Sequence, residues 1–122
     1  MPTKATQSEA QRIPKLRFPG FSGEWEEKKL GDITDRITKG TTPTTIGFNY
    51  HENGINFVKI ESITDSGAFI KDKFAHISEQ CNEALKRSQL KVNDILFSIA
   101  GALGRIALVD DNILPANTNQ AI

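Results

Sequence analysis

The segment from Leu90 to Val109, LKVNDILFSIAGALGRIALV, constrains the fold more than any other part of the sequence. Residues 95–100 alternate between two faces and include β-branched and aromatic side chains, which favours a strand. One face carries Ile95, Phe97 and Ile99, and the other carries Leu96, Ser98 and Ala100. Gly101 and Gly104 bracket a reversal, and Arg105–Val109 gives a second strand. A helix over this region would contain both glycines, each about 1 kcal/mol worse than alanine. We therefore expect a largely buried hairpin, preceded by a turn at Val92–Asp94.

The composition excludes several classes of protein. The chain has 122 residues, enough for one domain, and its 15 Lys and Arg side chains balance its 15 Asp and Glu side chains. Binding to nucleic acid or to an anionic membrane must therefore come from a local arrangement of charge. Cys81 is the only cysteine, so neither an intramolecular disulfide nor a paired-cysteine zinc site is possible. The sequence shows no bilayer-spanning apolar run and no secretory signal, so we expect a cytoplasmic protein without a membrane partner.

The chain divides into a leader and one domain. Residues 1–13 are polar and lack apolar periodicity, which indicates a disordered leader, and residues 14–122 are expected to form a single domain. Three aromatic residues, Phe18, Phe21 and Trp25, lie near the start of this domain. We expect them to lay an extended arm onto the domain surface.

The remaining patterns predict an α+β domain with a twisted, mostly antiparallel sheet and short helices. Residues 28–36 suggest a helical turn, residues 38–45 a loop, and residues 55–60 and 74–77 strands. Ser78–Ser88 is the clearest helix, with Ser78 as the N-cap and basic residues near its end. Its inner face would carry Cys81, Ala84 and Leu85, which favours a buried, unreactive thiol. The last three residues resemble the start of a strand.

Signatures of catalysis are absent from the sequence. The segment 101–104 lacks the length and the Lys-Ser/Thr ending of a phosphate-binding loop, and Ser98 lies outside a nucleophile elbow. The two histidines, His51 and His76, lie in dissimilar contexts, and a metal or small-ligand site around them is the least favoured interpretation. We expect a chain that is not an enzyme by itself and that has no cofactor.

Polar residues in loops suit hydrogen bonding to nucleic acid. Asn and Gln can pair with adenine, Thr can donate, accept or contact a thymine methyl group, and Lys and Arg suit phosphate or guanine. The groove-facing candidates are Lys39, Thr41, Thr42, Thr44, Thr45, Asn49, Tyr50 and His51, with Asn119 and Gln120 near the end. Asn117 belongs to the same polar group. The candidates for phosphate contact are Lys59, Lys71 and Arg105. Asn119 and Gln120 could instead hold the backbone of a neighbouring strand.

Short motifs follow one another along the chain in a fixed order. They are PKLRFPGF (14–21), EWE (24–26), KLGDI (29–33), GTTP (40–43), GINFVKI (54–60), LKVNDILFS (90–98), GRIALV (104–109) and NQAI (119–122). This ordered series resembles the N-terminal part of specificity subunits from type I restriction–modification systems. The resemblance runs from about Pro14 to the last residue. Asn93 departs from the family, which often has Gly before Asp, but both residues suit a turn.

The resemblance implies a target recognition domain that reads double-stranded DNA. In this family, methylation and cleavage belong to separate methyltransferase and restriction subunits, which would be the partners of this chain. The domain is expected to be incomplete at its C-terminus, which would leave a sheet edge able to pair with another copy. The alternative is a protein-interaction module that docks to a methyltransferase subunit through Phe18, Phe21 and Trp25 and does not contact DNA.

Overall fold

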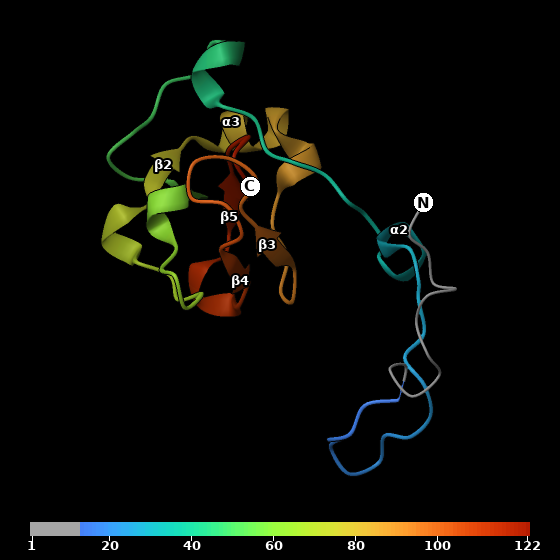
Figure 1. Ribbon diagram of the computed structural model, residues 1–122. Helices are drawn as coiled ribbons and strands as arrows, with labels where there is room; N and C mark the ends of the chain where they lie inside the picture. Colours follow the sequence, from blue (N-terminus) through green and yellow to red (C-terminus); the bar gives the residue numbers. More distant parts are fainter. Residues whose placement is uncertain (1–12) are drawn as a thin grey trace. The chain divides into compact units, whose positions relative to one another are not determined.

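The computed structural model describes residues 13–122, which belong to two compact units (Figure 1). Unit 1 ends at Ile37, and unit 2 runs from Thr38 to Ile122. The expected leader, residues 1–13, lies almost entirely outside the described residues. In unit 1, the expected helical turn is present as α2 (Leu30–Ile33). No helix within residues 13–122 is long and apolar enough to span a membrane.

Unit 2 contains a three-stranded mixed sheet. Its middle strand is β1 (Ile55–Val58), with β2 (Ala75–Ile77) antiparallel on one side and β5 (Ala116–Thr118) parallel on the other. Together with the helices, this sheet confirms the α+β class. The prediction of a strand at the last three residues is wrong, because β5 ends at Thr118 and a turn follows. The Asn119 side chain accepts a hydrogen bond from the Ala121 backbone N–H at 3.1 Å and closes that turn.

The predicted hairpin is present as β3 (Ile95–Phe97) and β4 (Ile106–Leu108), paired antiparallel. The turn before β3 is also confirmed, because Asn93 adopts a φ of 70° and the Asp94 carboxylate accepts a hydrogen bond from the Lys91 N–H at 2.8 Å. Left-handed backbone suits Asn better than most other residues, which explains Asn at this position.

Burial of the hairpin is confirmed on one face only. Leu96 and Ala107 point into the core and are 5% and 2% exposed. The opposite face remains open to solvent, contrary to the expectation of a largely buried hairpin. Its side chains are all apolar: Ile95 (72% exposed), Phe97 (52%), Ile99 (51%), Ile106 (54%) and Leu108 (58%).

The predicted helix begins where expected but ends early. In α3 (Glu79–Ala84), the Ser78 hydroxyl accepts a hydrogen bond from the Cys81 N–H at 3.1 Å, which confirms the N-cap. A 3₁₀ turn, η5 (Lys86–Ser88), follows in place of the last helical turn. Cys81 and Leu85 pack with Phe57 and Ile77 in a buried cluster, and burial raises the pKa of the Cys81 thiol. Ala84 is exposed, so its place on the inner face was wrong.

Candidate nucleic-acid interface

The loop at residues 39–45 lies against the C-terminal end of the chain, and Gly40 makes this approach possible. The Gly40 N–H donates to the Ile122 carbonyl at 3.3 Å. A Cβ atom on Gly40 would overlap the backbone carbonyls of Thr118 and Asn119, so only glycine fits without a backbone shift. Beyond Gly40 the chain forms η2 (Pro43–Ile46), a 3₁₀ helix with Pro43 at its start.

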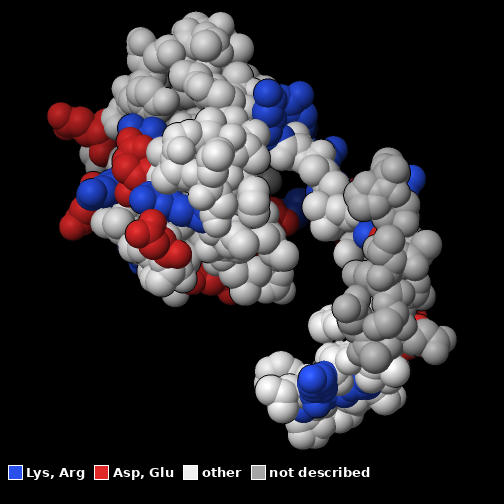
Figure 2. Space-filling view, viewed as in Figure 1, with Lys and Arg blue, Asp and Glu red and all other residues white. Residues whose placement is uncertain are grey.

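An open pocket of about 300 Å³ forms where this loop meets two other segments. Thr42 donates a hydrogen bond from its hydroxyl to the side-chain carbonyl of Gln120, which joins residues 78 positions apart. The lining contains two cations and no carboxylate, in a chain that has 15 cationic and 15 acidic side chains in all. Figure 2 shows cationic and acidic side chains intermixed on one side of unit 2. The lining residues are Lys39, Gly40, Thr41, Thr42, Thr45, Arg87 and Gln120.

Arg87 is the lining residue that the sequence analysis missed. Arg87 lies near the end of the predicted helix, where a basic side chain interacts favourably with the helix dipole. This role was enough to explain a basic residue at this position. The real helix ends at Ala84, and η5 carries Arg87 to the pocket. The sequence signal that could have found Arg87 is its basic character alone, which is weak for an exposed position.

Thr44, Asn49, Tyr50 and His51 do not line the pocket, although all four are exposed. The Tyr50 ring contacts the ring of Phe57 edge-to-face, with centroids 5.7 Å apart. Burial raises the pKa of Tyr50, and the positive charge of Lys59 partly opposes this rise. The His51 backbone N–H donates to the carbonyl of His76 at 2.9 Å, so this residue borders the edge of β2.

The three candidates for phosphate contact lie in different surroundings. Lys71 is exposed at the start of η4 (Lys71–Lys73). The Lys59 ammonium lies 3.2 Å from the Glu61 carboxylate and 5.7 Å from the centroid of the Tyr50 ring. Lys71 is therefore the more exposed of these two lysines.

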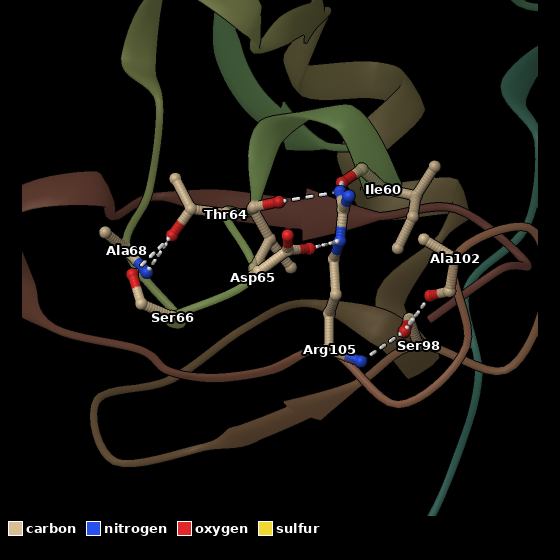
Figure 3. A network of polar contacts seen from close by, with 9 residues as sticks. Ile60, Thr64, Asp65, Ser66, Ala68, Ser98, Ala102 and Arg105 are labelled. Carbon is tan, nitrogen blue, oxygen red and sulfur yellow. Dashed lines mark hydrogen bonds and ion pairs between the residues drawn. The ribbon is translucent and has the colours of Figure 1, made fainter.

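Hydrogen bonds to other residues of unit 2 hold the guanidinium of Arg105 in place (Figure 3). Its Nε donates to Asp65 at 3.0 Å, and its Nη1 donates to the carbonyls of Ile60 and Ile63 at 3.0 and 2.9 Å. Its backbone N–H donates to the Ser98 hydroxyl at 2.7 Å. These contacts compete with the expected binding of phosphate, which stays a prediction for this residue.

Asn117 holds the backbone of a neighbouring segment, whereas the Asn119 side chain binds the backbone of its own turn, and its contact with DNA stays a prediction. The Asn117 side chain is fully buried, so its place among the exposed polar candidates was wrong. It accepts from the Ser88 hydroxyl at 2.6 Å and donates to Asn82 and to the Leu85 carbonyl. This network fixes η5 against β5, and thereby fixes one wall of the pocket.

The described residues offer no further metal ligands beside the two histidines. His51 and His76 are neighbours across a β-bridge, although they are 25 positions apart in the sequence. Within residues 13–122, no group of three or more His, Cys, Asp or Glu side chains is placed to hold a metal ion. A separate hollow of about 580 Å³ in unit 1 is lined by residues of both charges and by none of the predicted DNA contacts.

The pocket of this small α+β unit presents hydroxyl, amide and cationic groups, which are kinds of group that can contact nucleic acid. The sequence is similar to the specificity subunit of type I restriction enzyme EcoBI from Escherichia coli. The two are 36% identical over 62 residues, which make up 51% of this chain and 13% of that subunit. No protein-family model matches the sequence.

Proposed function

We propose that this chain recognises a specific sequence of double-stranded DNA as part of the specificity subunit of a type I restriction–modification complex. The pocket that joins the loop at residues 39–45 to Gln120 and Arg87 carries this proposal, because it gathers base-reading and phosphate-binding groups. The similarity to the EcoBI specificity subunit supports the same class of function. The chain would act in the cytoplasm, without a cofactor and without catalysis of its own.

The pocket offers two kinds of contact. Gln120 and the threonines have the donors and acceptors that read base edges in the major groove, and Gln pairs in particular with adenine. The hydrogen bond from Thr42 fixes the side-chain carbonyl of Gln120, which leaves the amide nitrogen to donate to a base acceptor. Lys39 and Arg87 supply the phosphate contacts that set the register of the domain on the duplex. Lys59 and Lys71 would add phosphate contacts outside the pocket.

The partners follow from the same proposal. The methyltransferase subunits would bind this chain directly, and the restriction subunits would bind through them. The chain would then decide where modification and cleavage occur, while its partners supply both reactions.

Selection from a random duplex library tests the role of the pocket. Gln120→Ala should change the preferred sequence, because it removes a base contact; a bidentate contact contributes about 1–3 kcal/mol of discrimination, and a single contact from the amide nitrogen contributes less. Gln80→Ala is the matched control, because Gln80 is exposed on α3 and lies outside the pocket. An unchanged preference in Gln120→Ala would contradict the base-reading role.

Salt dependence tests the phosphate contacts. Lys39→Ala should weaken binding to all sequences alike and reduce the slope of log affinity against log salt by about one. Lys29→Ala, in unit 1 and also exposed, serves as the control. DNA binding that is independent of ionic strength would remove the electrostatic part of the proposal.

A second candidate function is docking to a methyltransferase subunit without DNA contact. The observation that favours it is the exposure of Phe18, Phe21 and Trp25 in unit 1, and the expectation that they pack on the domain surface stays a prediction. Replacing the three by alanine should abolish co-purification with the methyltransferase subunit. If docking is the whole function, Gln120→Ala should have no effect on any DNA preference.

A further inference from the structure

We infer that this chain forms a weak, reversible dimer through the solvent-facing side of its β3–β4 hairpin. This surface, called the hairpin face, consists of Ile95, Phe97, Ile99, Ile106 and Leu108. It goes beyond DNA recognition, because it contains no charged or hydrogen-bonding side chain that could contact a nucleic acid.

The strand pairing places the outward side chains next to one another. Ile95 lies opposite Leu108, and Phe97 lies opposite Ile106. Directly opposed residues of an antiparallel pair share a face of the sheet. The exposed apolar side chains therefore form one continuous surface.

Both faces of these strands are apolar, which is typical of strands covered on two sides. Leu96 and Ala107 already fill the inner side, and nothing in unit 2 covers the outer side. A strand that faced water permanently would alternate apolar with polar residues. The sequence pattern of the hairpin therefore calls for a covering surface that is itself apolar.

The exposed area fits a small interface between two copies. Because its five side chains are between 51% and 72% exposed, the hairpin face presents apolar surface on the order of 400 Å². A standard interface buries about 800 Å² on each partner, and weak, transient complexes bury less. The hairpin face alone therefore supports a transient dimer, whereas an obligate dimer would need a larger surface.

A twofold axis suits this surface, because an apolar face without charges is complementary to itself. The end of the hairpin near Asp94 and Asp110 is acidic, whereas the turn at residues 100–104 is uncharged. An antiparallel arrangement of the two hairpins places the acidic end of one copy against the uncharged turn of the other. This arrangement avoids repulsion between like charges.

Sedimentation of the full chain over about a hundredfold range of concentration tests the inference. The wild-type protein should shift reversibly from monomer to dimer. Ile95→Lys should weaken this association at least about tenfold, because a buried lysine charge would have no partner in the interface. The side chain is mostly exposed, so the variant should fold, which circular dichroism checks. Leu16→Lys, at an exposed position of unit 1, should associate as the wild type does.

Oxidative cross-linking locates the contact. Phe97→Cys should give a covalent dimer, because the twofold axis brings the two copies of this central position together, and the native Cys81 is buried. A monomer at all concentrations would overturn the inference. That result is expected if unit 1 of the same chain covers the hairpin face. A dimer that resists Ile95→Lys, or that does not cross-link at position 97, would equally overturn it, and would point to pairing along a sheet edge.

Discussion

Replacing Gly40 with alanine should destabilise unit 2 and disrupt the pocket. The new methyl group would overlap the carbonyls of Thr118 and Asn119, and these backbone atoms cannot move aside as a flexible side chain could. Inserting a methyl group into a packed site costs about 1–3 kcal/mol. Displacing the loop also removes the hydrogen bond from the Gly40 N–H to the Ile122 carbonyl, which adds about 1 kcal/mol. The free energy of unfolding should therefore fall by about 2–4 kcal/mol.

Urea denaturation followed by circular dichroism measures this loss. The control is Gly31→Ala, because Gly31 lies in α2 with no neighbouring atom within 4 Å of the added methyl group. That variant should be as stable as the wild type or slightly more so, since alanine favours a helix by about 1 kcal/mol over glycine. Gly40→Ala should also lose affinity for DNA, because the displaced loop separates Thr42 from Gln120. If both variants unfold at the same urea concentration as the wild type, the close approach of the loop to β5 is refuted.

Other perturbations test the Asn117 network, the hydrogen-bonded Arg105 and the response of stability to acid. Asn117→Ala should lower the free energy of unfolding by about 2–4 kcal/mol in urea denaturation, because it leaves several buried groups without partners. Arg105→Lys should reduce the free energy of unfolding by about 1–2 kcal/mol, because lysine cannot reproduce the fork of contacts. The slope of log affinity for DNA against log salt should stay unchanged, because lysine keeps the positive charge. The pKa of Glu61 is lowered from 4.5 by a hydrogen bond from its own backbone and by Lys59. Its charge therefore stabilises the fold above this pH and ceases to do so as the pH falls through the lowered value. Glu61→Gln should cost less than about 1 kcal/mol near neutral pH and nothing in acid, as unfolding at several pH values would show.

Local patterns were sufficient to predict the hairpin and the start of α3, but they predicted neither β5 (Ala116–Thr118) nor the early end of α3. The period-two alternation placed the hairpin, and the serine before an acidic first turn placed the start of α3. These signals work because they depend on neighbours in the sequence. The exposure of the hairpin face could not be predicted, because two apolar faces indicate that a strand is covered on both sides without naming the covering partner.

The pocket depends on contacts that no local pattern records. The loop at residues 39–45 was expected to be functional from its polar residues together with the family resemblance, but Gln120 and Arg87, which line the pocket with it, lie far along the chain. Arg87 reaches the pocket because α3 ends early and η5 turns the chain. If the helix continued to Ser88, the side chain of Arg87 would lie elsewhere. Predicting this position would have required the packing of Asn117 against η5, which is a tertiary contact.

The turn after β5 connects the two surfaces of unit 2. Three consecutive residues make three separate contacts: Gln120 with the Thr42 hydroxyl, Ala121 with the Ile99 N–H at 2.8 Å, and Ile122 with the Gly40 N–H at 3.3 Å. A strand would direct these groups into a regular ladder with one neighbour, whereas a turn can direct each group to a different segment. The turn therefore holds the loop at residues 39–45 and the end of the hairpin in one hydrogen-bonded assembly. The Ile99 N–H binds the carbonyl of Ala121, and Ala121 is the neighbour of Gln120 in the sequence. A displacement of Ile99, which belongs to the hairpin face, would therefore act on Gln120 in the pocket through one hydrogen bond and one peptide bond.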